Sequence, residues 1–216
     1  SDRSGDLWKV KKDGNSKIKI HGIPKVSSEN QGGLLDIEIH PRFNENNLIY
    51  LSFSDFLINQ KHKTYTAIIC GVLKNNNLTQ QRTIYKAPDS LYTLEKHHYG
   101  TRIIFSNDGY LFFAIGDRGQ REKAQLLNYP NGKIHRLHAD GSVPQDNPFV
   151  NNEMALPSIW SYGHRNPQGL VIHPHTGEIW EAEHGPMGGD ELNVIFPGNN
   201  YGWPVITYGK NYDGSI

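Results

Sequence analysis

Short apolar runs that alternate with polar turns are the dominant pattern along the chain. In three segments an apolar strand leads through a polar turn into a second strand that ends in a charged or imidazole side chain. Taking Pro41, Asn107 and Pro174 as equivalent turn positions, the steps are 107 − 41 = 66 and 174 − 107 = 67 residues. Such a period predicts a repeated antiparallel β unit. The three segments are Gly33–Asp55, Gly100–Asp117 and Gly169–Gly185.

A second series of markers lies between these segments. Runs that end at Gly14, Asn77 and Gly141 advance by 63 and 64 residues, and each resembles a strand that leads into a tight Asn/Asp/Gly hairpin turn. Two independent markers therefore share nearly one period.

The repeats predict an all-β protein, because the chain shows no sustained helical periodicity with caps and only one short helix candidate, near residues 120–127. Antiparallel repeats of this length are typical of a β-propeller, in which each blade is a four-stranded meander. A chain of 216 residues holds little more than three units of about 65 residues, and a propeller ring needs at least four blades. We therefore expect either part of a larger propeller or a different all-β architecture.

Composition narrows the classes of function. The 22 basic residues balance the 22 acidic ones, so no charge favours binding to nucleic acid or to an acidic membrane. No apolar run is long enough to span a bilayer, and the chain does not open on a secretory signal, which leaves the compartment undecided. The single cysteine, Cys70, lies in an apolar run and is expected to be a small buried hydrophobe.

A candidate acid–base pair flanks the second repeat. His98 precedes its first strand and Asp117 follows its second strand, so an up-and-down hairpin would bring the two together. A carboxylate beside an imidazole orients a general base and stabilises the imidazolium. The alternative is that both side chains are simply solvated at strand ends.

The third repeat holds further polar candidates. Arg165, between helix-breaking residues, could clamp a carboxylate or polarise a carbonyl, or else pair structurally with a nearby acid. His164 could be a ligand, but we interpret it as a structural imidazole, and we interpret His173 and His175 as surface turn residues rather than zinc ligands. The loop of residues 183–191 offers carboxylates and backbone carbonyls suited to calcium, or is a polar turn in which Asp190 caps a backbone group.

The order and spacing of several motifs resemble the soluble sugar dehydrogenases that depend on pyrroloquinoline quinone (PQQ), the aldose and glucose dehydrogenase family. The resemblance extends from LWKV near the N-terminus to NYGWP near the C-terminus. The motifs are QGGLLDIEIHP, HYGTR, AIGDRG, NGKIHRLHADGSVPQDNPF, YGHRNPQGL, EHGPMGGDELN and GNNYGWP.

This resemblance implies a six-bladed β-propeller with PQQ bound near its axis, of which residues 1–216 form a single domain that is partial at both ends. It also implies oxidation of the anomeric carbon of aldose sugars to lactones by hydride transfer to PQQ. His98 would be the general base and would also contact the sugar, as would Gln31. Asp117 would orient His98, while Arg165 and Asn166 would lie against the quinone.

Calcium is the second cofactor that the resemblance implies. The carbonyls of Gly185 and Pro186 would bind the ion that also holds the quinone, and this ion would act as a Lewis acid. Glu191 and the carbonyl of Tyr201 match a second, structural calcium site, and His184 is expected near the first ion. The family is commonly exported, so the resemblance implies a periplasmic or secreted protein.

Two departures from the family pattern bear on function. The residue before the catalytic histidine is an acid in some members and is His97 here, which leaves the preferred sugar undecided. The basic residues that pair with the PQQ carboxylates in the family lie beyond the matching stretch. We expect a fragment that is poorly stable alone, because unpaired blade faces favour association.

Two other functions are compatible with a propeller. One is a non-catalytic domain that binds protein or carbohydrate, which the presence of His98, Asp117, Arg165 and Asn166 disfavours. The other is a calcium-dependent hydrolase such as a lactonase, which needs a ring of Asp, Asn and Glu side chains around a central metal. The loop at Gly185–Pro186 matches the quinone family better.

Overall fold

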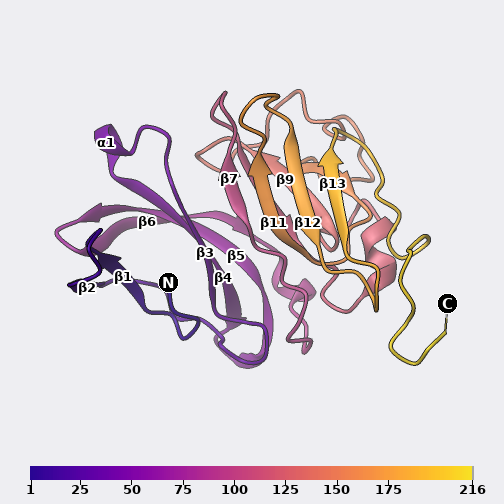
Figure 1. Ribbon diagram of the computed structural model, residues 1–216, viewed down its shortest axis with the longest axis horizontal. Helices are drawn as coiled ribbons and strands as arrows, with labels where there is room; N and C mark the ends of the chain where they lie inside the picture. The colour runs from indigo at the N-terminus through magenta and orange to yellow at the C-terminus, as the bar shows by residue number, and fades with distance from the viewer. Residues whose placement is uncertain (216) are drawn as a thin grey trace. The chain divides into compact units, whose positions relative to one another are not determined.

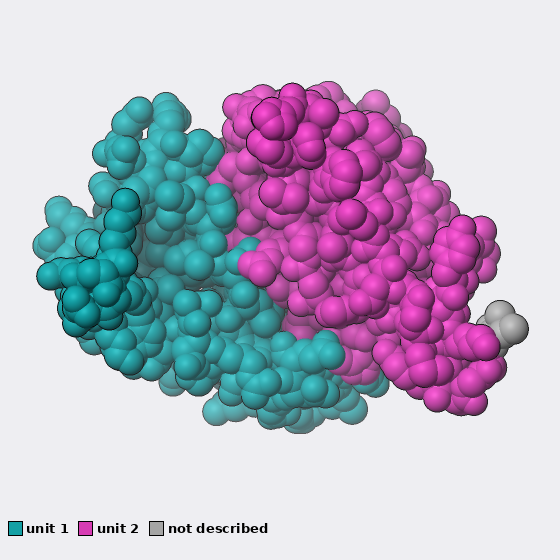
Figure 2. Space-filling view, in the orientation of Figure 1, with its two compact units in different colours: residues 1–96 teal, residues 97–216 magenta. Residues whose placement is uncertain are grey.

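The structure is a computed structural model that describes residues 1–215. The chain divides into two compact units, residues 1–96 and residues 97–216 (Figure 2), and each is described by itself. The expectation of one domain over residues 1–216 stays a prediction.

The first unit is built from an antiparallel meander in which sequence neighbours are also spatial neighbours, in the order β3-β4-β5-β6. The turn between β5 and β6 is tight because Asn75 and Asn76 both take positive φ angles, 49° and 61°, which is the backbone of a two-residue hairpin. This confirms the hairpin predicted at Asn77. The elements are β1 (Leu7–Val10), β2 (Lys17–Ile20), β3 (Leu34–Ile39), α1 (Phe43–Asn46), β4 (Leu48–Leu57), β5 (Gln60–Lys74), β6 (Asn77–Lys86) and the 3-10 turn η1 (Asp89–Leu91).

The core of this unit is apolar. Alternate residues of β4, including Ile49, Leu51 and Phe53, contact one cluster that also holds Leu7 and Ile20 of the β1-β2 hairpin. Cys70 is buried as predicted. The two-residue period of a strand therefore explains which side chains reach the core.

The second unit holds two sheets (Figure 1), one of four strands in the order β10-β9-β8-β7 and one of three in the order β11-β12-β13. All of their neighbouring strands are antiparallel. The elements are β7 (Ile103–Phe105), β8 (Leu111–Ile115), the 3-10 helix η2 (Arg121–Gln125), β9 (Lys133–Leu137), β10 (Ile159–Tyr162), β11 (Pro167–Ile172), β12 (Ile179–Glu183) and β13 (Glu191–Ile195).

The predicted repeats match this architecture. Each predicted segment corresponds to one consecutive strand pair: β3 and β4, β7 and β8, and β11 and β12. The short helix expected near residues 120–127 is η2. Every large sheet is therefore a meander of consecutive strands, the unit from which propeller blades are made.

One sequence prediction was wrong. The run that ends at Gly141 does turn back, since His138 donates its N–H to the carbonyl of Ser142, but no tight hairpin follows. The next strand, β10, begins only at Ile159. The connection contains Pro144, Pro148 and Pro157, which lack the N–H that a central strand needs.

Within residues 1–215, no helix is both long and apolar enough to cross a membrane.

Candidate functional site

His98 and Asp117 form the hydrogen-bonded pair that their positions predicted. The Nδ1 atom of His98 lies 2.8 Å from Oδ1 of Asp117, and the Asp117 side chain is 2% exposed. The antiparallel pairing of β7 and β8 explains the contact, because the residues before β7 lie beside the residues after β8.

The Asp117 carboxylate receives donors from three directions. Its Oδ1 also accepts from the Gly119 N–H at 2.7 Å, and its Oδ2 accepts from the indole Nε1 of Trp203 at 2.8 Å. Burial alone would raise the pKa of Asp117, but the hydrogen bonds from His98, Gly119 and Trp203 hold that pKa below its usual value. An ionised Asp117 requires a proton on Nδ1 of His98, which leaves the lone pair of the neutral ring on Nε2.

The backbone that carries His98 is constrained. His98 itself has a φ of 52°, in the left-handed region that residues other than glycine rarely adopt. The Arg118 side chain is fully buried, stacks at 3.6 Å on the Tyr99 ring, and donates a hydrogen bond to the carbonyl of His97. A Cβ at Gly116 would lie 2.4 Å from the His98 carbonyl oxygen, so only glycine fits at this close approach.

Arg165 and Asn166 lie beside this pair. The Asp117 N–H donates to the Arg165 carbonyl at 2.8 Å, and the Gly100 N–H donates to Oδ1 of Asn166 at 3.4 Å. Both side chains are buried. The loop that follows β10 and the loop that follows β8 therefore meet at one place.

The conformation of the Arg165–Asn166 turn is set by Glu183, a residue that sequence reasoning missed. One oxygen of its carboxylate accepts from the backbone N–H groups of Arg165 and Asn166, and the other lies 3.2 Å from Nδ1 of His164. The guanidinium of Arg165 then donates to the carbonyl of His184 at 2.9 Å, while its Nε is buried and has no partner among the described residues.

The loop after β12 contains the cap that one interpretation of its sequence predicted. Asp190 does cap a backbone group, because its Oδ1 accepts from the Gly185 N–H at 3.0 Å. Its Oδ2 lies 3.3 Å from Nδ1 of His184, and this contact lowers the pKa of Asp190. A Cβ at Gly185 would lie 1.7 Å from the Gly189 carbonyl, so the loop is too tight for any other residue there. Gly185 and Pro186 are buried, and their carbonyls remain candidate calcium ligands.

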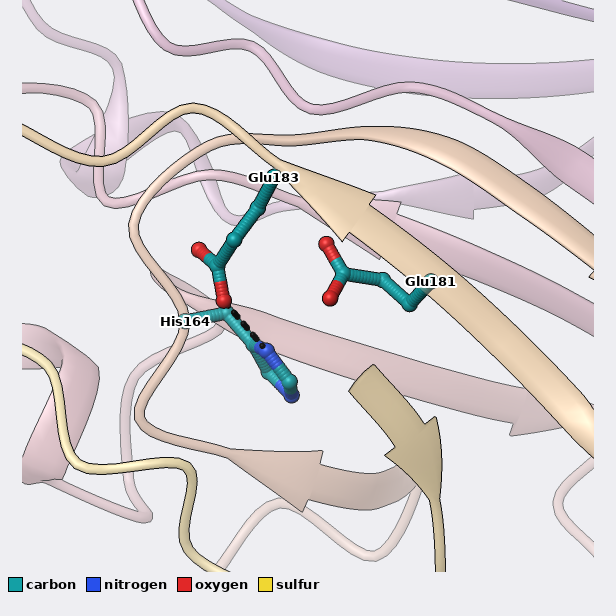
Figure 3. A group of neighbouring side chains, drawn as sticks. All are labelled: His164, Glu181 and Glu183. Carbon is teal, nitrogen blue, oxygen red and sulfur yellow. Dashed lines mark hydrogen bonds and ion pairs between the residues drawn. The ribbon is translucent and has the colours of Figure 1, made fainter. Parts of the chain in front are cut away.

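Two buried glutamates of β12 form a cluster with His164, called the buried acidic group below. His164, Glu181 and Glu183 bring potential ligand atoms within 4.8 Å of one another (Figure 3). Burial, and then the neighbouring Glu183 charge, raises the pKa of Glu181 to about 9. One Glu181 oxygen, Oε1, has no hydrogen-bond partner among the described residues. The sequence signal for this group was the Glu-x-Glu spacing in β12, which places both carboxylates on one face.

The two residues predicted for the second calcium site, Glu191 and Tyr201, lie next to this group. Glu191 pairs in register with Glu183, and the Nδ2 of Asn193 donates both to Glu191 at 3.3 Å and to Glu181 at 3.1 Å. Tyr201 stacks on His164 with a centroid separation of 4.8 Å.

Three histidine interpretations are supported. His164 is fully buried, and its second ring nitrogen, Nε2, lies 2.9 Å from the Ser161 hydroxyl, so both nitrogens are engaged. His173 and His175 lie around the turn between β11 and β12, as predicted. We therefore treat His164 as structural.

Gln31, the predicted sugar contact, belongs to the first unit, where its N–H donates to the Lys96 carbonyl at 3.0 Å. His98 belongs to the second unit. The contact of Gln31 with a sugar stays a prediction.

These features define an all-β protein with an oriented histidine, a buried arginine and a loop rich in oxygen ligands. The family described as Glucose / Sorbosone dehydrogenase matches residues 1–216, and the chain belongs to that family.

Named relatives agree with this membership. The chain is 41% identical over 216 residues to the aldose sugar dehydrogenase YliI of Escherichia coli, covering 98% of this chain and 57% of the relative. It resembles the apo-form crystal structure of the soluble aldose sugar dehydrogenase of Escherichia coli with a TM-score of 0.92 and 40% identity, covering 99% of this chain and 61% of that one. It also resembles the PQQ-bound aldose sugar dehydrogenase of Streptomyces coelicolor, with a TM-score of 0.78 and 27% identity, covering 98% and 60%.

These relatives bear on the fold class and on how much of a relative's length the chain spans. The predicted fold class, an all-β six-bladed propeller of which this chain covers a part, is confirmed by the likeness to these structures. The chain spans 57% of the length of YliI.

Proposed function

We propose that the protein is a PQQ-dependent aldose sugar dehydrogenase that oxidises the anomeric carbon of the sugar to a lactone. The observation that carries the proposal is the His98–Asp117 pair, in which a buried, fully bonded carboxylate holds the imidazole beside Arg165 and Asn166. The names of the relatives support the class of reaction.

His98 is the general base in this proposal. Its Nε2 takes the proton of the anomeric hydroxyl, while Asp117 stabilises the imidazolium that results. The C1–H bond breaks as the C1=O bond of the lactone forms. The left-handed backbone at His98 and the packing of Arg118 on Tyr99 hold the ring in place, so that the base is oriented before the sugar binds.

PQQ, when bound, supplies the two-electron acceptor for the hydride that leaves C1. The Nε of Arg165 is buried and has no partner within residues 1–215, so it fits an anionic or carbonyl oxygen, which is what a quinone offers. Arg165 and Asn166 would hold the cofactor, and Arg165 would stabilise negative charge on its oxygen.

Calcium would bind at two places in this proposal. The carbonyls of Gly185 and Pro186 would hold the ion nearest the cofactor, where it would act as a Lewis acid. Glu191 and the Tyr201 carbonyl would hold a structural ion, and the Glu181 oxygen that has no partner among the described residues suits the same cation.

The remaining parts of the proposal concern substrate and place. His98 and Gln31 would contact the aldose, and an acceptor outside the protein would reoxidise the cofactor. The balanced charge gives no reason to expect nucleic acid as a partner. Resemblance to an exported family supports a periplasmic or secreted location.

Dye reduction by the purified protein tests this function. A panel of aldoses is supplied with and without PQQ and calcium to wild type, to His98→Gln and to a control, His173→Gln, in the turn between β11 and β12. We expect activity that needs both additions, is retained in the control, and falls about 10²–10⁴-fold in His98→Gln. If the full-length protein reduces no dye with any aldose, this result would contradict the proposed enzymatic function and favour the non-catalytic binding propeller.

A further inference from the structure

A tryptophan far along the chain completes the His98–Asp117 pair. We propose that Trp203 is a positioning residue of the proposed dehydrogenase. The indole N–H of Trp203 fixes the second oxygen of Asp117 and so sets the orientation of His98. The inference rests on the proposed function for its kinetic consequence, whereas the hydrogen-bond chain itself can be observed in the absence of any reaction.

The two oxygens of Asp117 are held by different donors. Oδ1 faces His98 and the Gly119 N–H, and Oδ2 accepts from the Trp203 indole at 2.8 Å. A carboxylate held at one oxygen alone can rotate about its Cβ–Cγ bond. The indole donor prevents that rotation, because turning Oδ2 away would leave a buried N–H without a partner.

The backbone that carries the Trp203 ring is held on both sides. Trp203 is buried, its backbone N–H donates to the Gly163 carbonyl at 2.9 Å, and its backbone carbonyl accepts from the side-chain amide of Gln125 at 2.6 Å. Gln125 belongs to η2, and Gly163 lies just before the Arg165–Asn166 turn. The residue that carries the indole is therefore tied to η2 and to the segment that leads into this turn.

Trp203 also contacts the side of the site where the cofactor is proposed to bind. The guanidinium carbon of Arg165 lies 5.3 Å from the centroid of the ring, within the range of a cation–π interaction. The ring edge thus bonds to Asp117 while the ring face attracts Arg165. One side chain links the proposed base to the proposed cofactor-binding arginine.

Burial alone does not explain the indole hydrogen bond. The indole nitrogens of Trp160 and Trp180 are also buried, and neither has a partner among residues 1–215. Trp203 is 86 residues from Asp117 in sequence, so the bond is a long-range feature of the fold. Trp160 therefore provides a matched control, an indole whose buried N–H bonds to nothing in the described chain.

The experiment compares Trp203→Phe with Trp160→Phe in the full-length protein. The first readout is the tautomer of His98, followed by ¹⁵N-histidine NMR without sugar or cofactor and assigned with His98→Gln. The second is kcat and KM for aldose oxidation with PQQ and calcium, measured across pH. If Trp203→Phe does not fold, benzothienylalanine at position 203 keeps the ring shape and removes only the N–H.

We expect the fixed Nδ1–H tautomer of His98 to be lost or averaged in Trp203→Phe and kept in Trp160→Phe. We expect kcat to fall about ten- to hundredfold with little change in KM, the scale typical of losing a residue that orients a ligand or base. In Trp203→Phe the acid limb of the plot of kcat against pH should move to higher pH. The reason is that Asp117 loses a donor that favours its charged form.

The inference is overturned if the His98 tautomer signal in Trp203→Phe matches wild type, whatever happens to kcat, because the indole would then act elsewhere. It is also overturned if kcat in an active enzyme stays within about twofold of Trp160→Phe. A wild-type protein that oxidises no sugar would contradict the proposed function instead, and the NMR comparison would still decide the role of Trp203.

Discussion

The two units bury different kinds of polar group. In residues 1–96 the buried polar side chains are one acid, Asp36, and small hydroxyls. The second unit buries a set of charged and titratable side chains in addition to its apolar cluster. They are Asp117, Arg118, Lys133, His135, Arg136, His164, Arg165, Glu181 and Glu183.

The difference follows where the proposed chemistry is concentrated. A buried charge is costly unless it is paired, so the first unit, to which the proposal assigns only the sugar contact of Gln31, buries few charged side chains. Several in the second unit lie at or next to the proposed base and cofactor contacts, where perturbed groups are expected at a functional site. Lys133 shows the cost, since burial lowers its pKa to about 7 even though its ammonium lies within 2.9 Å of three carbonyl oxygens.

The largest loss of stability should come from replacing Glu183, which holds the Arg165–Asn166 turn. Glu183→Ala leaves two buried N–H groups and His164 without their acceptor, and we expect it to lower the free energy of unfolding by about 3–5 kcal/mol. Glu183→Gln keeps one carbonyl acceptor and should lose less. Urea unfolding measures both, and a loss below about 1 kcal/mol in Glu183→Ala would show that this buried carboxylate is not structural.

Calcium should stabilise the second unit through its acidic group. At a concentration of 100 times Kd, a single bound ion adds about 2.7 kcal/mol to stability. In Glu181→Gln that gain should shrink, because Oε1, which has no partner among the described residues, would belong to an amide that cannot release a proton to bind the cation. Thermal unfolding with calcium and with chelator tests this, and equal gains in wild type and variant would place the ion elsewhere.

His135 should make stability depend on pH. Burial lowers its pKa from 6.5 to about 3, and the ring is held between Ser158 and the Pro130 carbonyl. The unfolded state therefore binds more protons between about pH 3 and pH 6.5, so the contribution is complete above this window and lost as pH falls through it.

Between pH 6.5 and pH 5 the loss from His135 should be about 2 kcal/mol, from roughly 1.36 kcal/mol for each pH unit. His135→Gln is expected to be less stable at neutral pH but flatter across this range. Denaturant titrations at several pH values measure the difference in slope, and parallel curves for the two proteins would contradict a neutral His135.

The smallest effect should come from a surface ion pair of the first unit. Lys19 and Asp6 lie 2.7 Å apart, and both are about two-fifths exposed. Asp6→Asn should cost less than about 1 kcal/mol and even less at high salt. Urea unfolding at two salt concentrations would show it, and a loss comparable to that in Glu183→Ala would remove the contrast between exposed and buried charge.

The sequence predicted what local pattern determines. The alternation of apolar and polar residues, together with the turn residues, located the strand pairs. The positions of His98 and Asp117 at strand ends predicted that they lie close together. Trp203 and Glu183 were missed because their partners depend on which loops meet in space. The run ending at Gly141 was misread because a local turn signal does not reveal the proline-rich connection after it.

In the proposed reaction, His98 takes a proton while hydride leaves the anomeric carbon. The decisive experiment is single-turnover reduction of added PQQ in the calcium-loaded full-length protein, with an aldose deuterated at C1. We predict slower reduction with the deuterated sugar in wild type and reduction at least about 10²-fold slower in His98→Gln. Reduction at an unchanged rate in His98→Gln, with no isotope effect in either protein, would rule out this role for His98.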